Sequence, residues 1–175
     1  CSCDLDHEVL RYSLDFESHP DNLAAALKGG LVASAVDSRG EALIEKLTVA
    51  AGVSTVVVIP AFELSTEKAR GVLPQTYSRK DAVFNIQRSA LTIAAMTAGH
   101  WQHLREAMQD RIHQPYRAPL IPGLEEILSL DTPGLVSVAL SGAGPTVLAI
   151  AEPAAAGNVG RAVAGVLDRK STRLN

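Results

Sequence analysis

A glycine turn between two apolar segments is the feature that most limits the folds open to this chain. The turn is Ser141-Gly142-Ala143-Gly144-Pro145-Thr146, and it separates the apolar segments 135–140 and 147–151. Short apolar runs bounded by turn residues are typical of strands, and a connection this short joins strands that run antiparallel. We therefore expect a hairpin in which Gly142 and Gly144 are free to take positive φ.

Other strands and helices are interspersed around this hairpin without a regular βαβ repeat. Residues 54–59 are rich in β-branched side chains and stop at Pro60, so they predict a buried strand, and 31–36 and 43–49 predict two more. Apolar periodicity predicts helices at 7–17, just before Gly29, and at 65–72, 80–98, 100–110, 124–130 and 155–167. This mixture favours an α+β fold, with helices layered on a mostly antiparallel sheet.

Individual residues set the predicted boundaries of several elements. Ser65 or Thr66 opens the helix over 65–72, and Ser78-Arg79-Lys80-Asp81 resembles a capping box with Asp in place of Glu. The helix that follows should bury an apolar stripe made of Val83, Ile86, Ala90, Ile93 and Ala94. Three prolines within 114–122 predict a loop there.

Composition limits the partners and the compartment. The chain has 175 residues, 47% of them hydrophobic, and a net charge of −3, which argues against a nucleic-acid or anionic-membrane surface. It has neither a membrane-spanning apolar run nor a signal peptide at its first residue, so we expect a cytoplasmic protein. The only cysteines, Cys1 and Cys3, cannot complete a zinc site and are expected to be reduced.

A polar cluster, His19-Pro20-Asp21-Asn22, precedes the short helix that ends at Gly29. Two interpretations remain open. Asp21 or Asn22 can simply cap the helix, or the three polar side chains can line a pocket at a helix N-terminus, where free N–H groups favour an anion. Asp15 and Glu17, just upstream, offer the oxygen donors that Mg²⁺ prefers.

The glycine turn also has two interpretations. It can be an ordinary hairpin turn, or a backbone nest that contacts a phosphate. It is not a Walker A loop, because no Gly-Lys-Ser/Thr follows, and its glycine spacing differs from a dinucleotide fingerprint. The histidines His100, His103 and His113 could suggest a metal site, but a solvated helix face explains His100 and His103 better.

Four ordered segments resemble the GHMP small-molecule kinases and, within them, the homoserine kinase family. Residues 17–26 are similar to that family's Glu-Gly-His-Pro-Asp-Asn stretch, with Ser18 in place of Gly. Three further segments, 66–74, 115–122 and 140–146, resemble its Thr-x-x-Ala-Arg-x-x-Leu-Pro segment, its Pro-x-Arg-x-x-Leu-Ile-Pro loop and the shared glycine motif. The resemblance runs from about Glu8 to Leu167.

The resemblance implies a reaction in which ATP, with Mg²⁺, phosphorylates the hydroxyl of L-homoserine to give O-phospho-L-homoserine for threonine synthesis. It implies that His19, Asp21 and Asn22 line the amino-acid site, where Asp21 could also accept the hydroxyl proton. Arg70 and Arg117 would hold the substrate carboxylate, a role suited to the planar guanidinium group.

The same resemblance assigns the metal and the phosphate contacts. Glu17 would bind Mg²⁺, with Asp15 as the fallback, and the turn residues Ser141, Gly142, Ala143 and Gly144 would support the phosphate. Two alternatives stay open: another GHMP kinase of mevalonate or sugar type, or a non-catalytic α+β module for ligand binding or dimerisation. The two arginines favour an amino acid over a neutral sugar, because only the amino acid offers a carboxylate.

The resemblance also implies how the chain is organised. The family's first motif, a phosphate loop rich in glycine and serine, has no match here, so we expect a C-terminal portion that is inactive alone. Residues 1–50 would be the remnant of an N-terminal nucleotide and substrate domain, and 51–168 a ferredoxin-like GHMP C-terminal domain. Residues 169–175 would form a disordered tail, and a homodimer is a further expectation.

Overall fold

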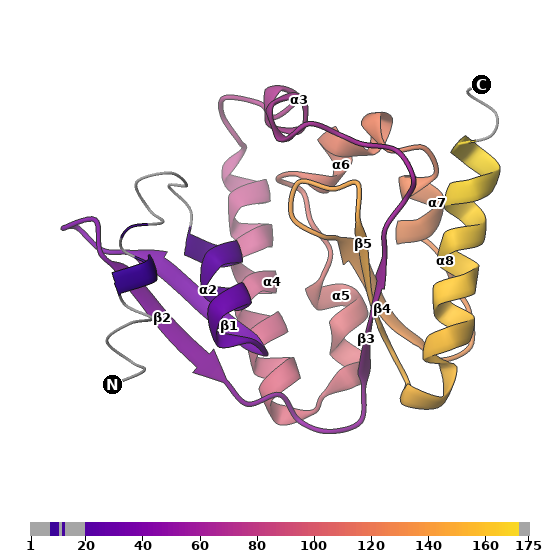
Figure 1. Ribbon diagram of the computed structural model, residues 1–175, viewed down its shortest axis with the longest axis horizontal. Helices are drawn as coiled ribbons and strands as arrows, with labels where there is room; N and C mark the ends of the chain where they lie inside the picture. The colour runs from indigo at the N-terminus through magenta and orange to yellow at the C-terminus, as the bar shows by residue number, and fades with distance from the viewer. Residues whose placement is uncertain (1–7, 11, 13–19, 172–175) are drawn as a thin grey trace. The chain divides into compact units, whose positions relative to one another are not determined.

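The structure is a computed structural model that describes residues 8–10, 12 and 20–171. The chain forms two compact units, Cys1–Ala50 and Ala51–Asn175. The predicted α+β class is confirmed, since each unit contains helices and an antiparallel sheet (Figure 1). Among the described residues, no helix is both long enough and apolar enough to cross a bilayer.

The first unit contains a helix packed on a hairpin. Helix α2 (Pro20–Lys28) begins with a proline, which suits a first turn because the missing N–H would find no helical partner there. Gly29 ends the helix with φ of 62°, and its N–H donates to the carbonyl of Ala25 at 2.9 Å. Strands β1 (Leu31–Val36) and β2 (Ala42–Leu47) then pair antiparallel.

Three antiparallel strands in the order β3-β5-β4 form the sheet of the second unit. Strands β4 (Leu135–Leu140) and β5 (Val147–Ala151) have the predicted bounds, and β3 (Ser54–Val58) ends one residue early. The glycine turn joins β4 to β5, as predicted.

Helix α8 (Ala156–Ser171), entered through the short helix η3 (Pro153–Ala155), covers one face of this sheet together with α7 (Leu124–Leu128) (Figure 1). The core on this face is closed by fully buried branched side chains: Val147, Val159, Val163, Ile121, Leu124 and Ile127.

The end of α8 corrects the expected tail. The helix continues through residues 169–171, which were expected to belong to a disordered tail. Arg169 and Lys170 pair with Glu126 at 2.9 and 3.3 Å, and basic side chains also favour the last turn of a helix.

Helix α4 (Arg79–Ala98), the short helix η1 (Trp101–His103) and α5 (Leu104–Ala107) lie on the opposite face. Because side chains alternate along β5, Ile150 points to this face, where it packs with Ala95, Leu104 and Ala107. This second core is smaller. Helix α5, which contributes two of its buried side chains, is only one turn long.

The buried side of α4 differs from the predicted one. Val83 and Ile86 are 44% and 69% exposed, whereas Ala95 is the buried residue of this helix. The orientation is fixed by Ala95 and by Thr92, whose hydroxyl donates to the carbonyl of Ala107 at 2.9 Å. The Ser78 cap is confirmed, because its Oγ accepts from the Asp81 N–H at 3.1 Å.

The loop predicted over 114–122 is wrong. Helix α6 (Gln114–Arg117) and the short helix η2 (Ala118–Leu120) occupy it. Proline is tolerated in the first turn of a helix, so Pro115 does not prevent a helix that begins at Gln114. Helix α3 (Thr66–Gly71) is confirmed, with the Ser65 hydroxyl accepting from the Lys68 N–H at 3.2 Å.

Candidate functional site

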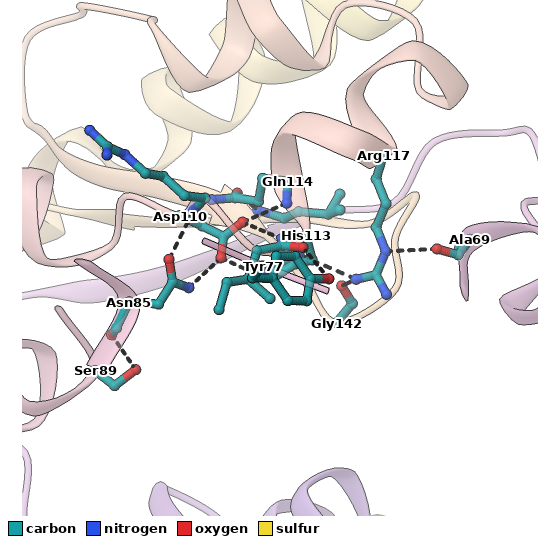
Figure 2. Close-up of polar contacts among 12 residues, drawn as sticks. Ala69, Tyr77, Asn85, Ser89, Asp110, His113, Gln114, Arg117 and Gly142 are labelled. Carbon is teal, nitrogen blue, oxygen red and sulfur yellow. Dashed lines mark hydrogen bonds and ion pairs between the residues drawn. The ribbon is translucent and has the colours of Figure 1, made fainter. Parts of the chain in front are cut away.

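Arg117, the last residue of α6, occupies the centre of a polar cluster in the second unit. The residue is only 8% exposed. Its Nε donates to the carbonyl of Ala69 and its Nη1 donates to the carbonyl of Gly142, each at 3.0 Å. One guanidinium group thus joins α6 to α3 and to the glycine turn, as Figure 2 shows.

A second arginine lies beside this group. Burial lowers the pKa of Arg117, Asp110 and Tyr77 act to raise it, and the charge of Arg70 lowers it again. Arg70 is exposed and directly follows Ala69 in α3. Because guanidinium groups stay protonated in proteins, the positive charge of Arg117 lies at the glycine turn, within electrostatic reach of Arg70, and favours an anionic ligand such as a carboxylate.

Asp110 holds the start of α6. Its side chain is 6% exposed, and its Oδ2 accepts hydrogen bonds from the N–H groups of His113 and Gln114 at 2.7 and 2.6 Å. Its Oδ1 accepts from Asn85 of α4 at 2.6 Å. Burial alone would raise the pKa of the Asp110 carboxyl, but these hydrogen bonds outweigh it and hold the pKa below its ordinary value.

His113 lies between Asp110 and Arg117. Its Nδ1 is 3.2 Å from Nη1 of Arg117, and its Nε2 is 3.8 Å from Oδ1 of Asp110. Burial lowers the pKa of His113, Asp110 acts to raise it, and Arg117 lowers it further. The ring is therefore neutral at neutral pH, and because Arg117 can only donate, Nδ1 is the acceptor and Nε2 carries the proton.

The glycine turn has one packed side and one open side. A Cβ added to Gly144 would lie 2.8 Å from Ile121 and 2.9 Å from Leu140, whereas a Cβ at Gly142 would have no described atom within 4 Å. The N–H groups of Ser141 and Gly144 bond inside the turn, to the carbonyls of Thr146 and Ser141. A ligand at this turn would therefore meet the N–H groups of Gly142 and Ala143.

The front cluster belongs to the first unit. Asp21 and Asn22 are exposed in the first turn of α2, and Oδ1 of Asp21 accepts from the N–H of Asn22 at 3.0 Å. Since α2 begins at Pro20, neither residue is the helix cap that one interpretation predicts. His19, Glu17 and Asp15 lie outside the described residues.

No group of three His, Cys, Asp or Glu side chains that could hold a metal occurs in the described part of the chain. Both residues expected to bind Mg²⁺ lie outside that part. Within the described residues, the donor chemistry of the cluster is that of an anion site, built from guanidinium and backbone N–H groups.

The structure thus joins Arg117 to Gly142 and places Arg70 within electrostatic reach of Arg117, and it adds residues that sequence reasoning missed. Asp110 and Asn85 were not singled out, and His113 was considered only as a metal ligand. A signal was present, because an acidic residue shortly before Gln114-Pro115 fits a side-chain cap with proline in the first turn. The neighbouring prolines instead favoured a loop.

Comparison with known proteins gives one consistent result. Residues 92–168 match the family described as GHMP kinases C terminal. The homoserine kinase of Solibacter usitatus is 49% identical over 144 residues, which cover 82% of this chain and 47% of that protein. The homoserine kinase of Moorella thermoacetica is 43% identical over 167 residues, which cover 95% of this chain and 56% of that protein.

A solved structure agrees with these relatives. The crystal structure of homoserine kinase from Cytophaga hutchinsonii matches with a TM-score of 0.76 at 29% identity, covering 86% of this chain and 48% of that chain. This chain spans about half the length of the curated relatives it matches. The resemblance found in four motifs is confirmed: residues 92–168 form a GHMP kinase C-terminal domain, and the chain is similar to homoserine kinases over most of its length.

Proposed function

We propose that the protein to which this chain belongs transfers the γ-phosphoryl group of ATP to the side-chain hydroxyl of L-homoserine. The product, O-phospho-L-homoserine, would serve threonine synthesis. The names of the relatives support this reaction. The structural observation that carries it is the buried Arg117 guanidinium, fixed by the carbonyls of Ala69 and Gly142 next to Arg70.

Arg117 and Arg70 would bind the substrate carboxylate. The hydrogen bonds of Arg117 use Nε and Nη1, and no acceptor among the described residues bonds Nη2. Nη2 therefore keeps two N–H donors for a ligand, in a group whose orientation is already set. A carboxylate bound by a pre-oriented guanidinium forms charge-assisted hydrogen bonds, which are about twice as strong as neutral ones.

Asp21, Asn22 and His19 would hold the other end of the amino acid. The Asp21 carboxylate pairs with the substrate ammonium and takes the hydroxyl proton as the hydroxyl oxygen bonds to the γ-phosphorus and the bond to the ADP oxygen breaks. Since the transition state of such transfers is loose, positioning contributes more than base strength.

The nucleotide and the metal would use the remaining predicted residues. The open side of the glycine turn fits a phosphate, because the N–H groups of Gly142 and Ala143 are not used inside the turn. Glu17, or Asp15 in its place, would bind Mg²⁺, which neutralises phosphate charge when bound.

The two other substrate classes fit less well. A neutral sugar offers no carboxylate to Arg117, so the buried guanidinium would gain no charge-assisted hydrogen bond from it. Mevalonate has a carboxylate for the arginines but no ammonium for Asp21. A non-catalytic ligand-binding module would bind the amino acid without turnover in any longer form of the protein.

Calorimetry on the 175-residue chain tests this proposal, with L-homoserine compared with 3-amino-1-propanol, which lacks the carboxylate. We expect L-homoserine to bind at least about tenfold more tightly, and Arg117→Gln to remove that preference. Arg161→Gln, on the exposed side of α8, is the matched control and should keep it. Equal binding of the two ligands, or tighter binding of D-galactose, would contradict the proposal.

A further inference from the structure

We propose that Asp110 and His113 are positioning residues, which orient the Arg117 guanidinium for carboxylate binding and make that binding sensitive to pH. This inference rests on the proposed function, because it concerns the same site. Neither residue has to contact the substrate. Their effect passes through the start of α6 and through one ring nitrogen.

The start of α6 is held in place by side chains from outside the helix. This helix has four residues, too few to hold its own geometry, since short helices are marginal without outside support. Asp110 supplies that support by accepting from the N–H groups of His113 and Gln114, and Asn85 of the long helix α4 holds the carboxylate in turn. The far end of α6, where Arg117 lies, is therefore placed relative to α4.

The ring of His113 contacts the Arg117 guanidinium directly. It precedes Arg117 by four residues, one helical turn, and its Nδ1 accepts from Nη1 of Arg117 at 3.2 Å. The other acceptors of Arg117 are backbone carbonyls of α3 and of the glycine turn, 48 and 25 residues away in sequence. His113 is thus the contact that fixes the guanidinium relative to its own helix.

The contact between His113 and Arg117 depends on the protonation state of His113. Protonation of His113 would place an N–H donor at Nδ1, opposite the N–H of a cation, so the hydrogen bond would become a repulsion. The ring is reached from a cleft of about 340 Å³ that it lines together with Asp110 and with Arg88 of α4. A proton from solvent can therefore reach it.

The charged groups around His113 come from several elements. Asp110 precedes α6, Arg117 ends it, and Arg88 faces the same cleft from α4. Tyr77 and Arg70 influence Arg117 from the segment before α4 and from α3. Glu106 pairs with Arg88 at 3.3 Å, and Asp110 is the negative group that acts on His113 itself. A proton on the ring would place a second positive charge beside Arg117, opposite that one carboxylate.

Three variants separate positioning from simple structural support. His113→Asn keeps an acceptor at the place of Nδ1 and does not titrate, so it should preserve the orientation of Arg117. His113→Ala removes the acceptor, and Asp110→Asn weakens the hydrogen bonds to the N–H groups of His113 and Gln114 at the start of α6. His103→Ala, at an exposed histidine of η1, is the matched control.

The first readout needs no ligand. In NMR spectra of the chain labelled at histidine and arginine nitrogens, we expect His113 to be neutral with its proton on Nε2 at about pH 7.5. The Arg117 side-chain signals should shift in His113→Ala and in Asp110→Asn, and stay near wild type in His113→Asn and His103→Ala. Arg117 signals unchanged in His113→Ala, or a proton on Nδ1, would overturn the proposal.

The second readout is the affinity for L-homoserine at about pH 7.5 and about pH 5.5. We expect His113→Ala to bind about tenfold more weakly at the higher pH. The wild type should lose affinity at the lower pH by more than His113→Asn does, because only the wild-type ring titrates. Equal pH profiles for these two proteins would overturn the proposal. Absence of any L-homoserine binding would contradict the proposed function, while the NMR readout would still decide the positioning role.

Discussion

The two faces of the second unit's sheet differ in composition: one is covered by a large apolar core, and the other carries a polar network. Under α8 the core is large and includes fully buried branched side chains such as Val159, Val163 and Ile127. Under α4 and α5 the core is small, and polar side chains from Asn85 to Arg117 continue it toward the glycine turn. Stability is concentrated on one face, and the candidate site lies on the other.

This division explains why the buried polar network is tolerated. An unpaired buried charge costs several kcal/mol, but each charge in the network has several partners. Asp110 alone accepts three hydrogen bonds, two of them from backbone N–H groups at the start of α6. The apolar burial on the α8 face thus offsets the free-energy cost of burying this polar network.

The largest expected effect comes from breaking the α8 face. Ile127→Ala should lower the free energy of unfolding by about 2–5 kcal/mol, because Ile127 is fully buried and leaves a cavity. The matched control is Ile86→Ala on the exposed side of α4, at a side chain that is 69% exposed, and it should cost no more than about 0.5 kcal/mol. Urea unfolding followed by the fluorescence of Trp101 measures both, and equal losses would refute the comparison.

A smaller difference in stability is expected between alanine substitutions at the two glycines of the turn. Gly144→Ala should cost about 2–3 kcal/mol, because φ is 84° and the new methyl would meet Ile121 and Leu140 of the α8-side core. Gly142→Ala has φ of 57° and open space, so it should cost about 1–2 kcal/mol. The same urea experiment compares them. A larger loss for Gly142→Ala would show that the turn packs the other way.

The smallest expected effect is a pH dependence of stability on the site face. Because the folded pKa of His113 lies below its ordinary value of 6.5, the unfolded chain binds the proton more readily. Stability contributed by the neutral ring is present above pH 6.5 and falls as the pH drops toward the folded pKa. His113→Asn should remove this part of the profile. An unchanged profile, measured by urea unfolding across the range, would argue against a partly buried, neutral ring.

At lower pH a second group contributes to the same profile. Asp110 has a folded pKa below its ordinary value of 3.8, so its contribution is present above that value and is lost as the pH falls through the folded pKa. Asp110→Asn should remove this acid part and, because the Asp110 charge raises the pKa of His113, should move the His113 part to lower pH. The loss from His113 begins near pH 6.5 and that from Asp110 near pH 3.8, and His113→Asn, which removes only the first, assigns the two side chains.

The elements that the sequence predicted well depend on local signals. Strand β3 follows from a run of β-branched residues before Pro60, and the hairpin β4–β5 from glycines between apolar runs. The exposed stripe on α4 could not be foreseen, because periodicity does not say which side of a helix packs when small residues occur on both. Helix α6 was missed because Asp110, whose carboxylate accepts from the N–H groups at the start of the helix, lies outside the proline-rich segment that favoured a loop.

The candidate site was predicted only in part, for a related reason. The roles of Arg70 and Arg117 came from the family resemblance, since nothing local to either residue indicates a ligand. The partners that hold Arg117 are backbone carbonyls distant in sequence, and no spacing rule points to them. The predicted grouping of these arginines with Asp21 and Asn22 joins residues of two units and stays a prediction.

The central claim is that Arg117 binds the carboxylate of an amino-acid substrate, and one measurement tests it most directly. The chain labelled at arginine nitrogens is titrated with L-homoserine and, separately, with 3-amino-1-propanol, while the Nη2 signals of Arg117 are followed by NMR. We predict that L-homoserine shifts these signals and that the analogue without a carboxylate leaves them in place. Equal shifts with both ligands, or no shift with L-homoserine while other signals of the chain move, would contradict the claim.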